Sequence, residues 1–168
     1  MRQAFATMLA SALLLLSLSA CGGSANKSGD EANHAHSALH ITASGDVQEL
    51  TAGKEVLPSF LDGQHENIVL VYRAVSEYPE LLDGMPCYCG CGDSAGHRSN
   101  RDCFIHEVKE DGSIVWDDHG TKCNVCLEIA VESIQMKQGG KAAGEIRTFI
   151  DEKYREGYAK PTDTPLPL

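Results

Sequence analysis

The chain has 168 residues, a formal net charge of −10 and seven cysteines. Once terminal segments are set aside, that length leaves room for one small domain. An acidic chain with 14 Lys and Arg residues and no basic run argues against nucleic acid and anionic lipid head groups as partners.

The first residues have the pattern of an export signal, which we place at residues 1–20. Arg2 precedes an apolar stretch from 4 to 18 that is too short to span a bilayer comfortably, and small residues follow it. Leu18-Ser19-Ala20-Cys21 resembles the lipobox of bacterial lipoproteins. This resemblance implies a diacylglycerol group on the Cys21 sulfur and an extracytoplasmic protein anchored to the cell membrane. An ordinary secretory signal or an uncleaved anchor is the alternative.

Residues 21–46 have the composition of a flexible tether, because Gly, Ser, Asn and Ala dominate. The tether contains His34, His36 and His40, which can bind a divalent metal weakly. We interpret them as polar linker residues, since a flexible segment has no neighbouring groups to hold the imidazoles in place. We place the domain at 47–157 and a loose, proline-rich tail at 158–168.

Apolar periodicity predicts three helices within the domain. Apolar residues recur near a 3.6-residue period from 61 to 78, and Pro79 ends that helix or begins a short turn. A second helix is expected from a cap at Thr121 to Gly139. A third is expected over 142–156.

A β-hairpin is predicted between the first two helices. Residues 104–108 alternate loosely between apolar and polar, Asp111-Gly112 is a turn signal, and 114–116 can form the returning strand. Two strands alone are marginally stable, so the hairpin must pack on the helices. The expected fold class is mainly α, or α+β if the hairpin forms: a small helical domain with a cysteine-rich loop.

Six cysteines remain after Cys21 is assigned to lipid, and all lie between residues 87 and 126. Three alternate in Pro86-Cys87-Tyr88-Cys89-Gly90-Cys91, and glycine lets that segment curl so that its sulfurs converge. Cys123 and Cys126 are expected in the first turn of a helix, where the dipole favours thiolates and the i, i+3 spacing puts both on one face. The candidate metal ligands are Cys87, Cys89, Cys91, Cys103, Cys123, Cys126, His97 and His119.

Clustered thiolates with one or two imidazoles suit Cu(I), Zn(II) or an iron–sulfur cluster. Four thiolates satisfy one tetrahedral zinc ion, whereas six exceed one such site and suit a small Cu(I) cluster. We rank Cu(I) slightly above Zn(II). Iron–sulfur ranks behind both, because an exported protein rarely acquires such a cluster outside the cytoplasm.

Two other interpretations of the thiols stay open. An even number of cysteines outside the cytoplasm is compatible with disulfides that staple a small interaction module, for example Cys89 to Cys126. Cys123-Asn124-Val125-Cys126 also resembles the exchange motif of thioredoxin-like enzymes, although no βαβ pattern surrounds it. We assign no catalytic residue and favour a binding protein over an enzyme.

The order of these motifs resembles a family of exported bacterial proteins named for their PCYCGC motif, which stands here at residues 86–91. The resemblance covers residues 57–156. It implies one shared fold and, because members are often lipoproteins, it agrees with a lipid on Cys21. The family has no established activity, so the function must be argued from the residues. The further matching segments are Gly96-His97, Ser99-Asn100, Asp102-Cys103-Phe104, Trp116-Asp117 with His119, and Cys123-Asn124-Val125-Cys126.

Overall fold

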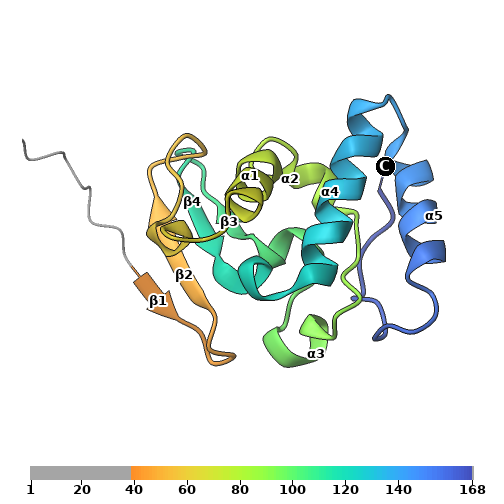
Figure 1. Ribbon diagram of the computed structural model, residues 1–168, viewed down its shortest axis with the longest axis horizontal. Helices are drawn as coiled ribbons and strands as arrows, with labels where there is room; N and C mark the ends of the chain where they lie inside the picture. The colour runs from red at the N-terminus through yellow and green to blue at the C-terminus, as the bar shows by residue number, and fades with distance from the viewer. Residues whose placement is uncertain (1–38, 168) are drawn as a thin grey trace, which may run out of the picture. The chain divides into compact units, whose positions relative to one another are not determined.

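A computed structural model describes residues 39–167, so the predicted signal peptide, Cys21, His34 and His36 lie outside the described residues. The described part combines a four-stranded antiparallel sheet with five α-helices (Figure 1). This confirms the α+β form of the expected fold. Within residues 39–167, none of the helices has both the length and the apolar character needed to cross a bilayer.

The sheet has the strand order β1-β2-β4-β3. The predicted hairpin is confirmed as β3–β4, but it does not stand alone, because β2 pairs with β4 and joins segments far apart in the sequence. In that pairing Leu50 lies opposite Val115 and Thr51 opposite Ile114. The strands are β1 (Leu39–Ile41), β2 (Val47–Thr51), β3 (Ile105–Val108) and β4 (Ile114–Asp117).

The ordered fold begins before residue 47, within the predicted tether. β1 and the turn at 42–46 precede that boundary, and His40 lies in β1. The turn is closed by the Thr42 N–H, which donates to the Asp46 carbonyl at 2.9 Å. All three residues of β1 are exposed, so the strand carries no alternation of buried and exposed residues that a sequence pattern could detect.

Helix α4 lies at the centre of the helical part, in contact with α1, α2 and α5 (Figure 1). Pro79 is the first residue of α2, and Gly139 ends α4, both as expected. Cys123, not Thr121, caps α4, because the 3-10 helix η3 (Asp118–Lys122) comes directly before it. The helices are α1 (Glu66–Val75), α2 (Pro79–Asp83), α3 (Cys91–Ala95), α4 (Asn124–Gln138) and α5 (Ala143–Lys153).

Three aromatic residues connect the sheet to the helices in the core. Tyr72, Phe104 and Trp116 are fully buried, and the Tyr72 and Phe104 rings meet edge to face with centroids 5.2 Å apart. The Trp116 indole donates to the Thr51 hydroxyl at 2.8 Å, and the Tyr72 hydroxyl donates to the Asp117 carbonyl at 2.7 Å. The polar ends of the Trp116 and Tyr72 rings are therefore satisfied inside the core.

The segment after α5 is not a loose tail. The Ala159 N–H donates to the Tyr88 carbonyl and the Thr162 N–H to the Cys87 carbonyl, each at 3.0 Å. Thr162 and Thr164 are buried. The sequence-based expectation fails here because a proline-rich composition favours an extended backbone without indicating whether that backbone finds a partner. We call residues 159–164 the C-terminal strap.

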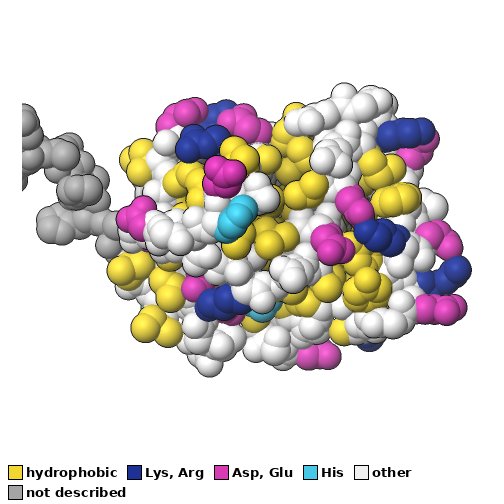
Figure 2. Space-filling view, viewed as in Figure 1, with side chains coloured by type: hydrophobic (Ala, Val, Ile, Leu, Met, Phe, Trp, Pro, Cys, Tyr) yellow, Lys and Arg dark blue, Asp and Glu magenta, His cyan; other side chains and the backbone are white. Residues whose placement is uncertain are grey.

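The surface has no single charged region on the face shown in Figure 2, where Lys and Arg side chains stand among Asp and Glu. Between α1 and α4 there is a shallow apolar groove lined in part by Ile68, Val71, Leu127 and Val131. This groove is separate from the thiols, since no cysteine lines it.

We predict that Gly120→Ala destabilises the protein by about 1–3 kcal/mol, the usual range for overpacking a core. A Cβ at Gly120, in η3, would overlap the Phe104 ring and lie 3.0 Å from the Tyr72 hydroxyl oxygen. Urea unfolding followed by tryptophan fluorescence measures the change. The matched control is Gly144→Ala in α5, where a Cβ meets nothing within 4 Å and alanine should stabilise the helix by up to about 1 kcal/mol. Equal unfolding midpoints for the two variants would contradict this packing.

Candidate metal centre

The PCYCGC loop curls at a glycine. Gly90 has a φ of +88°, in the left-handed region that glycine adopts readily, and α3 begins at the next residue. Before this turn, the Cys87 and Cys89 sulfurs already lie 3.3 Å apart, closer than alternate residues on one face of a strand. The turn at Gly90 then directs Cys91 back toward them. The Cys91 sulfur lies within 4.8 Å of both.

Backbone hydrogen bonds hold this loop on two sides. On one side, the Cys87 N–H donates to the Thr162 hydroxyl of the C-terminal strap at 2.9 Å. On the other, the Asn100 N–H donates to the Met85 carbonyl at 2.8 Å, and the Asn100 amide donates to the Cys126 carbonyl at 3.2 Å. The loop is thereby fixed relative to the start of α4, where further sulfurs lie.

The start of α4 supplies two of those sulfurs. Cys126, in the first turn, is fully buried, and its sulfur lies 3.3 Å from that of Cys87 and 3.6 Å from that of Cys89. Cys123 caps the helix and is partly exposed. The Cys123 sulfur lies within 4.8 Å of the Cys89 and Cys126 sulfurs.

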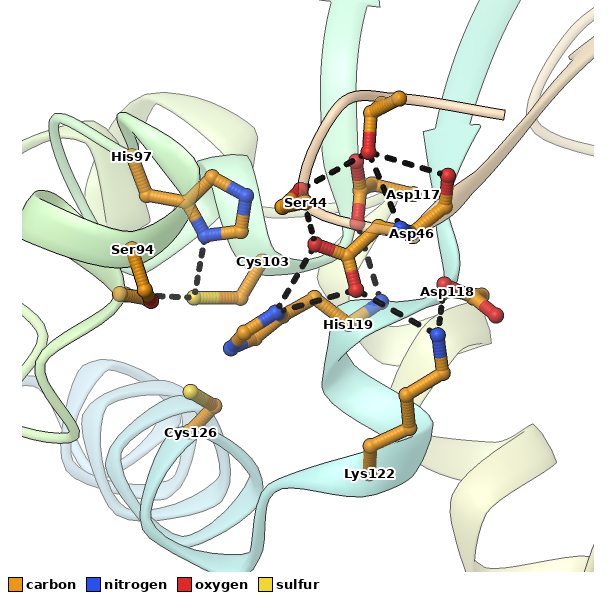
Figure 3. Close-up of polar contacts among 12 residues, drawn as sticks. Ser44, Asp46, Ser94, His97, Cys103, Asp117, Asp118, His119, Lys122 and Cys126 are labelled. Atoms are coloured by element: carbon orange, nitrogen blue, oxygen red, sulfur yellow. Dashed lines mark hydrogen bonds and ion pairs between the residues drawn. The ribbon is translucent and has the colours of Figure 1, made fainter. Parts of the chain in front are cut away.

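The segment between α3 and β3 supplies Cys103 and His97. The Cys103 sulfur is fully buried and lies 3.8 Å from the sulfurs of Cys87 and Cys91. The His97 Nδ1 atom lies 3.4 Å from the Cys103 sulfur, as Figure 3 shows. The His97 ring also meets the His119 ring edge to face, with centroids 4.7 Å apart.

His119 is held with one nitrogen toward the thiols and the other toward a carboxylate (Figure 3). Its Nε2 atom lies 3.8 Å from the Cys89 sulfur, and its Nδ1 atom lies 3.3 Å from both carboxylate oxygens of Asp46. Asp46 is 5 % exposed and is also contacted by Ser44 and Lys122. A carboxylate that accepts from Nδ1–H orients the ring and leaves Nε2 free to bind, which is the usual arrangement behind a metal-binding histidine.

The spacing of the sulfurs is compatible with a bound metal ion. All six cysteines of the cluster are free thiols. The sulfurs of Cys87, Cys89, Cys91, Cys103 and Cys126 each lie 3.3–3.8 Å from another sulfur, and that of Cys123 lies within 4.8 Å of two. A disulfide needs about 2.05 Å. Two sulfurs bound to one tetrahedral zinc ion at about 2.3 Å lie about 3.8 Å apart. Metal binding therefore requires less movement of the sulfurs than disulfide formation.

The thiols of the cluster differ strongly in pKa. Contact with Cys103 acts to raise the pKa of Cys87, but contacts with Cys126 and Cys89 lower it to about 5. Contact with Cys103 also raises the pKa of Cys91 and the pKa of Cys126 far above the usual range of a thiol. Close packing of the thiols thus favours the ionised form of some and the protonated form of others. A bound cation would replace those protons.

The sulfurs also favour a positive charge on His119. Hydrogen bonds to the sulfurs of Cys123 and Cys89 favour the imidazolium and raise the pKa of His119 to about 11. Burial acts to raise the pKa of Asp46, but the hydrogen bond from Ser44 and the charge of His119 hold it below its usual range. The positive charge that the sulfurs favour here is either a proton on the imidazole or a metal ion bound to it.

The donors form two sets of four, in each of which all donor atoms lie within 4.8 Å of one another. Four sulfur and nitrogen donors at such distances are the number and type that a tetrahedral zinc site uses. The cluster can therefore hold a metal ion. One set is Cys89, His119, Cys123 and Cys126, and the other is Cys91, His97, Cys103 and His119.

Comparison with known proteins places the chain in a family. The family model described as a protein of unknown function with PCYCGC motif matches residues 11–167. The chain belongs to this family. No curated protein and no solved structure matches the chain. The family description assigns no activity, so the function of this PCYCGC-motif protein rests on the geometry of its cluster.

Sequence reasoning missed two residues that support the cluster. Asp46 falls in the predicted tether, although Ser44-Gly45-Asp46 is a turn signal between two short segments that can form strands. Thr162 falls in the predicted loose tail, and no local pattern marks its pairing with Cys87. Asp117, which the sequence indicated only as part of a matching segment, caps η3, since its carboxylate accepts from the His119 N–H at 2.9 Å.

We predict that Asp46→Ala lowers the affinity for zinc by about 10–100-fold, the usual effect of removing a carboxylate behind a histidine ligand. Without Asp46, the His119 ring loses the acceptor that directs Nε2 toward the thiols. Competition with a chromophoric chelator measures the affinity. Asp62→Ala, at an exposed position outside the cluster, is the control for the loss of one negative charge. If both variants bind zinc equally well, Asp46 does not position His119.

Proposed function

We propose that this protein binds a soft transition metal ion, Cu(I) or Zn(II), through its clustered thiolates. One observation carries the proposal: six sulfurs and two imidazoles converge from the PCYCGC loop, the segment 97–103, η3 and the start of α4. Sulfur and imidazole donors select these metals over harder cations such as Mg²⁺ or Ca²⁺.

Both metals suit the donor set, for different reasons. A set of three thiolates with one imidazole is a common ligand set of zinc. The sulfur contacts that run through Cys87 and Cys126 suit thiolates that bridge several Cu(I) ions. Competition between the two metals for the reduced protein, followed by native mass spectrometry, identifies the preferred ion.

We further propose that metal binding takes place at the outer surface of the cell membrane. The lipobox-like Leu18-Ser19-Ala20-Cys21 supports cleavage before Cys21 and a lipid on its sulfur. The residues that link Cys21 to β1 would then hold the domain near the membrane. In this position the protein would scavenge the ion, store it or hand it to a partner.

We predict that the full-length protein, purified without oxygen, carries at least about one atom of copper or zinc per chain. Cys126→Ser should lower both the metal content and the melting temperature, because the Cys126 sulfur contacts two others in the middle of the cluster. Elemental analysis and thermal unfolding measure the two effects. Ala130→Ser is the matched control: it buries a hydroxyl in the same helix without removing a ligand, so it should lower stability and keep the metal.

Disulfides in the native chain would contradict the proposal under one condition. If all six thiols are in disulfides and the chain takes up neither ion after reduction, the result favours the stapled interaction module. Reduction of insulin by the protein, abolished in Cys123→Ser, would favour the redox alternative.

We predict that Cys21→Ser moves the protein from the membrane fraction to the soluble fraction of the cell envelope, since a lipid chain needs this sulfur. Metal content per chain should stay the same, because Cys21 is not one of the clustered cysteines. Quantitative immunoblotting of the two fractions measures the change. Retention of the variant in the membrane would show that another element anchors the chain.

A further inference from the structure

The two sets of donors differ in burial. We call Cys89, His119, Cys123 and Cys126 the outer set, since Cys89 and Cys123 are partly exposed. The cysteines of the other set, Cys91 and Cys103, are 1 % and 0 % exposed. An incoming ligand can therefore reach a metal ion in the outer set more easily than one next to Cys91 and Cys103.

The two sets also differ in how firmly the chain holds them. Cys91, His97 and Cys103 belong to one short segment that is closed by its own hydrogen bonds. The His97 N–H donates to the Cys91 carbonyl at 3.3 Å, and Arg98 pairs with Asp102 at 2.9 Å. The outer donors come from the PCYCGC loop, η3 and the start of α4. Asn100 connects the loop to α4, so a shift of η3 relative to these two elements would open the outer set.

The count of donors fits two ions. His119 appears in both sets, but its Nδ1 faces Asp46, so only Nε2 is free to bind one ion. Cys87 can then be the fourth donor beside Cys91, His97 and Cys103, because its sulfur lies 3.8 Å from that of Cys103 and within 4.8 Å of that of Cys91. It also lies 3.3 Å from the sulfurs of Cys89 and Cys126, so Cys87 stands where the two sites meet. Six sulfurs and two nitrogens thus supply four donors to each of two tetrahedral ions.

We infer that the cluster holds two metal ions with different roles, an inference that rests on the metal-binding function proposed above. The inner ion, bound by Cys87, Cys91, His97 and Cys103, stays with the fold. The outer ion, bound by Cys89, His119, Cys123 and Cys126, is exchanged with a thiol-bearing acceptor. In this exchange an incoming sulfur bonds to the outer ion as the Cys123–metal bond breaks, and the proton of the incoming thiol passes to Cys123. The metal keeps its oxidation state.

Zinc release tests this division. The full-length chain, reduced and loaded with Zn(II) without oxygen, is mixed with an excess of the chromophoric chelator 4-(2-pyridylazo)resorcinol. We expect two zinc ions per chain by native mass spectrometry. Absorbance should show one ion leaving at least about tenfold faster than the other, which corresponds to a difference of about 1.4 kcal/mol in activation free energy.

Two matched variants assign the phases of release. Cys123→Ser should bind one ion and lose the fast phase only. Cys91→Ser should lose the slow phase, with a lower melting temperature. If Cys91→Ser does not fold, Cys123→Ser decides alone, because a single remaining ion that leaves in the slow phase supports the division and one that leaves in the fast phase overturns it.

Failure of this inference is distinguishable from failure of the proposed function. Two ions that leave in a single phase overturn the division of roles. A single ion per chain overturns the two-ion inference and leaves metal binding intact. A reduced protein that takes up neither Zn(II) nor Cu(I) overturns both.

Discussion

Five of the six clustered thiols lie 3.3–3.8 Å from another sulfur, and thiols packed this closely cannot all ionise unless a cation lies among them. The carboxylates of Asp46 and Asp117 stand close to this cluster and add further negative charge. Thiols used only as core residues would need neither the carboxylate behind His119 nor an imidazole directed at sulfur. The demand for positive charge therefore explains why these groups occur together, and the metal-binding proposal follows from it.

The sheet and the aromatic core hold η3 in place, and η3 carries His119 of the cluster. The Tyr72 hydroxyl binds the carbonyl of Asp117, and Gly120 lies directly against the Phe104 ring. His119 stands between these two positions, so the packing of the core sets where its ring can lie. Asp46 reaches the same ring from the turn between β1 and β2. The His119 side chain in η3 is thus positioned by residues far from it in the sequence, Asp46 and Tyr72.

Local patterns predicted the elements that depend on local interactions. Pro79 and Gly139 marked helix ends, Asp111-Gly112 marked the β3–β4 hairpin, and the alternating cysteines marked the loop. Within η3, the Thr121 hydroxyl donates to the Asp118 carbonyl at 2.7 Å, so this residue extends a 3-10 helix in place of capping α4. Periodicity cannot distinguish these two uses of one threonine.

Local sequence patterns could not predict the contacts between distant parts of the chain. The pairing of β2 with β4, the contact of Asp46 with His119 and the pairing of the C-terminal strap with the loop each join residues more than 60 positions apart. An exposed strand and a proline-rich segment look like linkers until their partners are known. The sequence indicated which side chains can bind a metal, and only the fold showed what holds them.

The C-terminal strap imposes an order of events on biogenesis. A polypeptide that emerges N-terminus first presents the PCYCGC loop long before Thr162 is available to bind Cys87. During that interval the loop lacks the hydrogen bonds from the C-terminal strap, one of the two sets that hold it. Its sulfurs are then open to oxidants and to any metal ion. The loop can therefore reach its final set of hydrogen bonds only after residues 159–164 have emerged and paired with it.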